Sequence, residues 1–312
     1  MINRRHIRVK VMQSVYAMLQ SHNDDIIKEE KFVKHSVLKM FDLYVLNIQL
    51  LVAVQKLAAK KMALSKNKIL ATASDLNPNI KFINNKVIRT ISESISLEGY
   101  VELNKLHNWK ENDEYVKIIF EELLQSSLYE KYLADEEHSF KRDKNFVVDF
   151  FKEIIAPNEK LAEYYEDNMI SWVDDIPFVN TWVVKTLSKQ KAAGLFVLGS
   201  LYKDKDDEDF VSQLFRKTVL KQAEYELAIA EKTPNWESDR IAEIDMILIK
   251  MAITEFLNFP SIPTKVTINE YIEISKDYST SKSSFFINGV LDKISKEFIA
   301  NKKIVKIGRG LI

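Results

Sequence analysis

The 312-residue sequence contains no cysteine and only six glycines and six prolines. Without thiols, neither a disulfide framework nor a thiolate metal site can form, and such a composition fits a reducing compartment. Average chains contain roughly 7% glycine and 5% proline, so the residues that break helices are scarce here. Few breakers together with 45 acidic and 45 basic residues favour long amphipathic helices, and we predict an all-α fold.

Long apolar runs are missing too. No stretch of about 18 uncharged apolar residues occurs, so we expect no membrane-spanning segment. The N-terminus is basic, but Arg8 and Lys10 interrupt any apolar core that a signal peptide would need. We therefore expect a cytoplasmic protein.

The residue patterns that bind cofactors or carry out catalysis are not found either. The sequence has no G-x-x-x-x-G-K or G-x-G-x-x-G loop that could hold a phosphate. None of its five histidines are four residues apart, the spacing of a helical metal site. The pair Asp135 and His138 is a single carboxylate–histidine pair in an acidic run, which is better explained as a solvated acidic face. We expect no enzyme activity, no cofactor and no metal.

What the sequence does have is charge of both signs, unevenly placed. The first acidic residue is Asp24 and the last is Glu297, and each end of the chain beyond them is basic. These basic residues are Arg4, Arg5, Arg8, Lys10, Lys302, Lys303, Lys306 and Arg309. Blocks of like charge are usually solvated, and we expect residues 301–312 to form a basic tail.

Hydrophobic periodicity predicts a series of amphipathic helices. The clearest cover residues 3–20, 31–63, 113–133, 241–257 and 286–298. Asn3 is the expected N-cap of the first helix, whose arginines lie just beyond the edge of the core. Thr267 and Glu270 have the spacing of a capping box. Gly289 interrupts the last helix at a cost of about 1 kcal/mol relative to alanine, which indicates close approach of a second helix.

Four sequence blocks, in this order, carry a family resemblance. They are RRHIR at 4–8 followed by VMQSVY at 11–16, IDMILIKMAITE at 244–255, IPTKV at 262–266 and FINGVLDK at 286–293. Together they resemble the NusB family of bacterial transcription antitermination factors. The resemblance covers residues 1–20 and roughly 206–299, and it implies a small all-helical fold with an arginine-bearing first helix.

The resemblance also implies a function and a set of site residues. Members of the family pair with the small-subunit ribosomal protein NusE, bind a short single-stranded RNA element called boxA, and help to assemble an antitermination complex on RNA polymerase during ribosomal RNA synthesis. Carried over by position, the RNA-facing residues are Arg4, Arg5 and Arg8 of the first helix and Phe286 of the last. Asp245 lies where the family presents an acid to its ribosomal-protein partner.

The chemistry of these side chains agrees with the implied roles, although each has an ordinary structural explanation. Arginine offers a fork of donors to phosphate, and an exposed aromatic ring gives an unpaired base a stacking surface. Alternatively, the arginines form a solvated helix end. Phe286 could be a core residue, because Phe285 stands beside it and only one of the two need face inward.

The chain departs from the family pattern in several places. Lys282 stands where relatives commonly have an acid; this lysine either raises RNA affinity or reflects a partner surface that has changed. Thr254 stands where relatives commonly have tyrosine, and Lys250 replaces a frequent arginine. The largest departure is the additional helix between the first helix and the core. We expect residues 1–22 and 206–300 to form a NusB-like bundle and residues 23–205 an extra helical region. The alternative function is a helical protein–protein adaptor in a transcription or ribosome-assembly complex, with RNA binding weak or lost.

Overall fold

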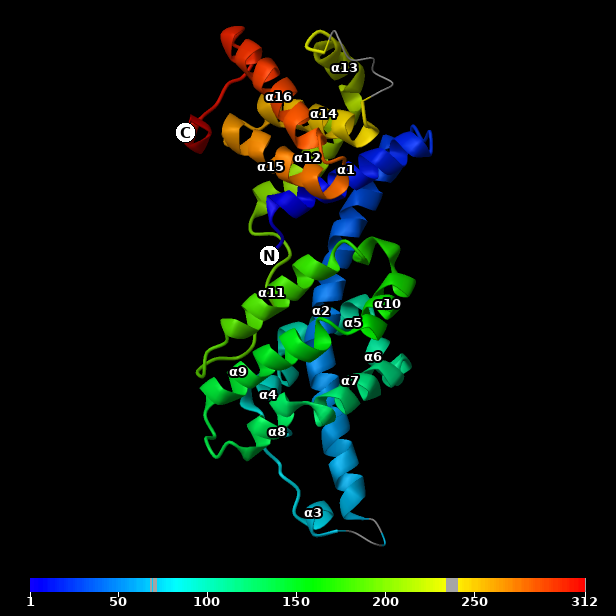
Figure 1. Cartoon of the computed structure of the whole chain (residues 1–312), viewed down its shortest axis with the longest axis vertical. Coiled ribbons are helices and arrows are strands. Elements are labelled where there is room, and N and C mark those ends of the chain that lie inside the picture. The colour runs from blue at the N-terminus through cyan, green and yellow to red at the C-terminus, as the bar shows by residue number, and fades with distance from the viewer. Residues whose placement is uncertain (68, 70–71, 234–240, 312) are drawn as a thin grey trace. The chain divides into compact units, whose positions relative to one another are not determined.

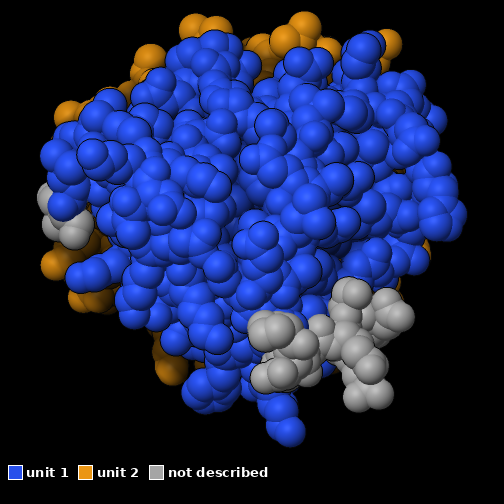
Figure 2. All heavy atoms as spheres, turned by 90° about the horizontal axis from the view of Figure 1, so that it is seen from above, with its two compact units in different colours: residues 1–37, 201–312 blue, residues 38–200 orange. Residues whose placement is uncertain are grey.

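The computed structural model describes residues 1–67, 69, 72–233 and 241–311. Every regular element in these ranges is a helix (Figure 1), which confirms the all-α prediction. The chain forms two compact units, coloured in Figure 2: unit 1 contains residues 1–37 and 201–312, and unit 2 contains residues 38–200. The boundaries expected from sequence were residues 22 and 206.

Unit 1 is a helical bundle built around α14. Its helices are α1 (Arg4–Gln20), the first turns of α2 (Ile26–Lys66), α12 (Lys205–Leu220), α13 (Gln222–Ala230), α14 (Glu243–Asn258), α15 (Thr264–Tyr278), α16 (Ser283–Ala300) and the 3-10 helix η4 (Gly308–Leu311). Every residue of α14 from Ile247 to Phe256 is buried. Such all-round burial marks a central helix, and α14 contacts α1, α12, α13, α15 and α16.

Unit 2 is built around the remainder of α2. From Met40 to Gln55 every residue of this helix is buried except Gln49 and Ala53. The indole N–H groups of Trp109 and Trp172 donate to backbone carbonyls of α2 at 2.9 and 2.8 Å, which anchors the shorter helices to it.

These shorter elements cover residues 73–188. They are α3 (Ala73–Leu76), α4 (Lys86–Ser92), α5 (Ile95–Asn104), α6 (Asn108–Glu111), α7 (Asp113–Gln125), α8 (Ser127–Ala134), α9 (Phe140–Phe150), the π-helix η1 (Phe151–Ile155), α10 (Glu159–Asn168), the 3-10 helix η2 (Ile170–Trp172) and α11 (Ile176–Ser188). By length and composition α2 could cross a membrane, but 78% of its most apolar window is buried inside the structure, as in a core helix.

Helix positions follow the predicted periodicity with one clear exception. The first helix begins at Arg4, and the Asn3 side chain accepts a hydrogen bond from the His6 amide at 3.0 Å, so the predicted N-cap is confirmed. The single helix predicted over residues 113–133 is wrong. It breaks at Ser126, whose hydroxyl accepts from the Tyr129 amide and caps α8, because serine satisfies a helix N-terminus better than it continues a helix.

The expected packing at Gly289 is also corrected. Nothing lies within 4 Å of a Cβ built on Gly289, and this residue is exposed, so the expected close helix approach is wrong. The close approach is at Gly310 instead, where a Cβ would lie 2.0 Å from the carbonyl oxygen of Pro260.

Part of the basic tail is packed rather than solvated. The Ile307 amide donates to the Pro260 carbonyl at 3.1 Å, and Lys306 Nζ donates to the Phe259 carbonyl at 3.0 Å. Burial lowers the pKa of the Lys306 ammonium. Lys306 therefore satisfies a carbonyl at the end of α14, as cations near helix C-termini do, whereas Ile312 and the Arg309 side chain lie outside the described residues.

Candidate nucleic-acid and partner interface

The first helix places Arg8 inside unit 1. Its side chain is 3% exposed, and its Nε and Nη2 atoms donate to the two carboxylate oxygens of Glu255 on α14, both at 2.8 Å. The guanidinium also lies over the rings of Phe210 and Tyr271. The expectation that Arg8 lies beyond the edge of the core is wrong, because Glu255 is a fully buried carboxylate that requires a cationic partner.

Glu255 also accepts hydrogen bonds from side chains of α15. Thr267 Oγ1 donates to it at 2.6 Å and the Tyr271 hydroxyl at 3.3 Å. Because α15 begins at Thr264, Thr267 lies inside the helix and does not cap it, and Glu270 binds arginines instead of a helix terminus. The predicted capping box is therefore wrong. Thr267 belongs to a buried polar cluster around Glu255, and the half-buried Glu270 binds Arg5 and Arg8.

This cluster fixes α1 against α14 and α15. Burial lowers the pKa of Arg8, but the charge and hydrogen bonds of Glu255 outweigh that effect and raise it overall, so Arg8 stays charged. Removing one partner of a buried ion pair costs about 3–5 kcal/mol, although the intact pair is often no more stable than apolar residues of similar size. The pair thus determines how the helices are placed more than it adds net stability.

Arg4 and Arg5 are the two arginines of this helix that reach the surface. Arg5, 45% exposed, forms a bidentate pair with Glu270 at 2.9 Å for both bonds. Arg4 is 30% exposed and donates to Asp207 at 2.7 Å. The hydrogen bond from Arg5 and the nearby charge of Arg8 lower the pKa of Glu270, against the effect of burial.

The start of α16 presents an aromatic ring and a cation to solvent. Phe285 is 81% exposed, Phe286 is half-buried and Lys282, the residue before the helix, is exposed. The sequence predicts Phe286 as the RNA-facing ring, and the structure gives Phe285 as the more exposed of the two. At 100° per residue, Phe286 lies closer than Phe285 to the direction of the buried residues Ile287 and Val290, and this signal could have identified Phe285.

Asp245 is 4% exposed and holds the turn that precedes α16. The Ser279 hydroxyl donates to Asp245 Oδ1 at 2.7 Å, and Ser279 and Thr280 in turn share hydrogen bonds with Ser283, the first residue of α16. Asp245, the residue expected to face a protein partner, therefore lies inside the bundle, where it orders the turn carrying Lys282.

Two of the departures from the family pattern, Lys250 and Thr254, are interior residues. Lys250 forms an ion pair with Glu226 of α13 at 2.5 Å while its own side chain is 6% exposed. Thr254 is fully buried, donates to the Lys250 carbonyl and accepts from Thr218 of α12 at 3.0 Å. Both residues therefore take part in packing α14.

Comparisons with known proteins agree with this architecture. The model of the NusB family matches residues 182–296. The transcription antitermination protein NusB of Salinibacter ruber is 42% identical over 123 residues, which are 39% of this chain and 77% of that protein. The NusB protein of Natranaerobius thermophilus is 35% identical over 98 residues, 30% of this chain and 70% of that protein.

A third relative, the NusB protein of Chloroherpeton thalassium, is 41% identical over 105 residues, which are 34% of this chain and 50% of that protein. No solved structure matches the chain. The family match does not include α1 or residues 38–181 of unit 2, and the chain is longer than these relatives. With a relative at 42% identity covered over 77% of its length, this chain belongs to the NusB family.

Proposed function

We propose that this protein is a transcription antitermination factor of the cytoplasm that binds boxA-like single-stranded RNA together with the ribosomal protein NusE. In this role it joins an antitermination complex on RNA polymerase and supports ribosomal RNA synthesis. The family of the chain supports the general role. The RNA, the ribosomal protein and the residues that contact them form the finer part of the proposal.

The observation that carries the RNA-binding proposal is the exposed ring of Phe285 beside Lys282. A phenylalanine 81% exposed on a helix inside the family match has no role in the core. Unpaired bases stack on such rings, while a nearby lysine attracts the backbone. We assign the stacking role to Phe285 in place of Phe286, and the phosphate-attracting role to Lys282.

The arginines of α1 divide between two roles. Arg4 and Arg5 provide the exposed donors, and phosphate oxygens would replace the carboxylates of Asp207 and Glu270 that now hold them. Arg8, enclosed with Glu255, holds the helix in position. Asp245 acts on the partner surface through the turn it orders.

Fluorescence anisotropy with a labelled boxA-like RNA and a scrambled RNA tests the proposal, with and without the cognate NusE protein. Phe285→Ala is expected to weaken boxA binding roughly 5- to 150-fold, the equivalent of about 1–3 kcal/mol for one stacked base. Phe286→Ala should weaken it less at equal fold stability. The control is Phe32→Ala, which removes a ring 51% exposed elsewhere in unit 1.

A salt series tests the arginines separately. Each phosphate contact to single-stranded RNA contributes about −0.7 to the log–log slope, so Arg4→Ala/Arg5→Ala should flatten the slope by roughly 1.4. Arg216→Ala removes an arginine that is 51% exposed and paired with Glu30, and it should leave the slope unchanged. Equal binding of boxA and scrambled RNA with NusE present would contradict the proposal.

A second candidate is the protein–protein adaptor. The observation that favours it is the size of unit 2, most of which lies outside the family match. If the purified chain binds RNA polymerase and NusE equally before and after RNase treatment, while Phe285→Ala has no effect on that binding, the adaptor function is preferred.

A further inference from the structure

Unit 2 contains a cavity that neither the helical framework nor the proposed RNA surface explains. Its volume is about 400 Å³, and it opens between α2, α5, α6 and α7. Its wall includes the apolar side chains of Val52, Leu97, Val101, Trp109 and Val116. Small-molecule sites have this size and this mostly apolar lining, with a few polar groups that orient the ligand.

The cavity coincides with a gap in the helical layer around α2. Between Met40 and Gln55 the only residues that are not buried are Gln49 and Ala53, and both line the cavity. Lys56 and Leu57, the two residues after Gln55, are not buried either and also line the cavity. The open stretch of α2 from Gln49 to Leu57 therefore forms one wall of the cavity.

One polar group in the wall lacks part of its hydrogen bonding. The Gln49 side chain donates from Nε2 to the Leu106 carbonyl at 3.4 Å. Its Oε1 atom is buried and accepts no hydrogen bond from the described residues. An amide oxygen in such a place favours a ligand that brings an N–H donor.

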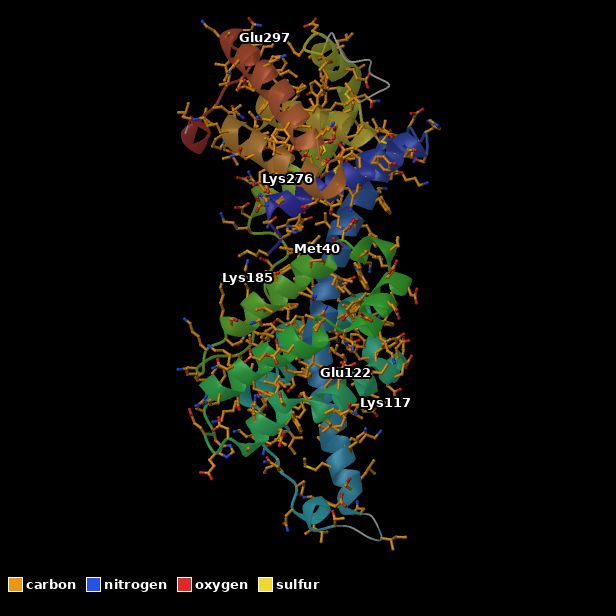
Figure 3. All side chains as sticks on the ribbon, in the orientation of Figure 1. Met40, Lys117, Glu122, Lys185, Lys276 and Glu297 are labelled. Carbon is orange, nitrogen blue, oxygen red and sulfur yellow. The ribbon has the colours of Figure 1, made fainter. Side chains whose placement is uncertain are left out.

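Charged residues of both signs line the cavity. Lys56 of α2, Lys110 of α6, and Glu98 and Glu102 of α5 are all exposed lining residues. Lys117, also in the wall and labelled in Figure 3, is paired with Asp113 at 2.8 Å. Neither Lys56 nor Lys110 forms an ion pair with another of the described residues, and we take their ammonium groups as the attraction for an anionic end of the ligand.

We propose that this cavity binds a small organic anion with a flat apolar body and an N–H donor. The apolar body lies against Trp109 and its neighbours, the donor reaches Gln49 Oε1 after a small adjustment of that side chain, and the anionic group lies near Lys56 and Lys110. Nucleoside monophosphates and aromatic sulfonates or carboxylates share this chemistry, and competition between them distinguishes the source.

The probe is 1-anilinonaphthalene-8-sulfonate, which has fused rings, an anilino N–H and a sulfonate. Titration of the full chain is expected to show one saturable site by fluorescence. Uridine monophosphate and indole-3-acetate are then tested as competitors. Displacement by the first alone indicates a nucleotide site, and displacement by the second alone indicates a site for aromatic acids.

Charge reversal and cavity filling test the location. Lys56→Glu/Lys110→Glu should weaken probe binding at least about tenfold by like-charge repulsion, while Lys60→Glu/Lys131→Glu makes the same change in net charge at exposed lysines of unit 2 outside the cavity wall. Ala53→Trp should abolish binding by filling the cavity. Circular dichroism establishes that each variant is folded before titration.

The role of Gln49 is tested with a second ligand. Gln49→Met should weaken the anilino probe about three- to tenfold, the value of one hydrogen bond, and leave naphthalene-1-sulfonate, which has no N–H, unaffected. The proposal is overturned if wild type shows no saturable site, if both charge-reversed variants bind alike, or if folded Ala53→Trp binds as wild type does. If the wild-type protein shows no saturable site for the probe but binds an amphipathic helical peptide, the proposal is overturned and the cavity belongs to a protein partner.

Discussion

Replacing Arg8 by methionine should destabilise unit 1 far more than replacing Arg5, its neighbour on the same helix. Arg8 and Glu255 are 3% and 0% exposed at the side chain, and methionine keeps the apolar stem while removing the charge. The Glu255 carboxylate would then be buried with only the hydroxyl groups of Thr267 and Tyr271 as donors.

The expected magnitude follows from the difference between a buried and an exposed pair. Leaving one buried charge without its partner costs about 3–5 kcal/mol. Arg5, 45% exposed beside Glu270, forms a pair of the surface kind, which is worth about 0–1 kcal/mol. Arg5→Met is therefore the matched control, because it removes an arginine with a bidentate carboxylate bond from the same helix.

A double variant separates the uncompensated charge from lost packing. In the Arg8→Met background, Glu255→Gln removes the negative charge and keeps an oxygen that accepts from Thr267. We expect it to recover at least about 2 kcal/mol of the loss, since the remaining cost is packing and one imperfectly satisfied amide.

The assay must report on unit 1 by itself, because two compact units need not unfold together. Hydrogen exchange of α14 peptides, read by mass spectrometry across a urea series, gives the opening free energy of that helix, and peptides from α9 serve as the unit 2 reference. The reasoning is refuted if Arg8→Met costs less than about 1 kcal/mol, or if the double variant is no more stable than Arg8→Met.

Three further predictions concern α1, the tail and α16. Burial and the charge of Arg5 lower the pKa of His6 to about 4 from an ordinary 6.5. Between these pH values the unfolded chain binds the proton more readily than the folded chain does. The stability that neutral His6 contributes is therefore present above pH 6.5 and lost as the pH falls toward 4. Urea midpoints of unit 1 at pH 7.5 and 5 should differ less in His6→Asn than in wild type. Gly310→Val should displace the tail from Pro260, because a Cβ there meets a carbonyl oxygen at 2.0 Å, and proteolysis of residues 301–312 should become faster; unchanged cleavage would contradict the packed tail. Gly289→Ala should raise the stability of unit 1 by up to about 1 kcal/mol, since the site is exposed and open, and a lower melting temperature would contradict that geometry.

The sequence allowed the helices to be predicted well where a single periodicity determined them. Residues 4–20 and 243–258 were placed within two residues, because apolar residues repeat at the helical period in the first and form a run too long for a strand in the second. The break at Ser126 was missed because the apolar pattern continues through α7 into α8, and a serine within such a pattern is compatible with either a cap or a helix.

The site was predicted less well because its contacts are distant in the chain. Arg8 and Glu255 are 247 residues apart, and no local pattern marks either one as half of a buried pair. Thr267 and Glu270 match a capping box in spacing, but the helix begins at Thr264. Thr267 instead donates to Glu255, and Glu270 accepts from Arg5. The exposed Phe285, in contrast, follows from the helical wheel and could have been found.

The three arginines of α1 show how one local motif can serve two purposes. A basic cluster at helical spacing appears uniform in sequence, yet Arg8 points into the bundle while Arg4 and Arg5 remain at its surface. Because Arg8 binds α14 through both oxygens of Glu255, rotation of α1 about its axis would break a buried charge pair. The orientation that satisfies Arg8 is also the one that leaves Arg4 and Arg5 at the solvent. Arg8→Met should therefore reduce RNA binding in proportion to the loss of amide hydrogen-exchange protection in α1. Arg4→Ala/Arg5→Ala should reduce RNA binding while the amides of α1 stay protected from hydrogen exchange.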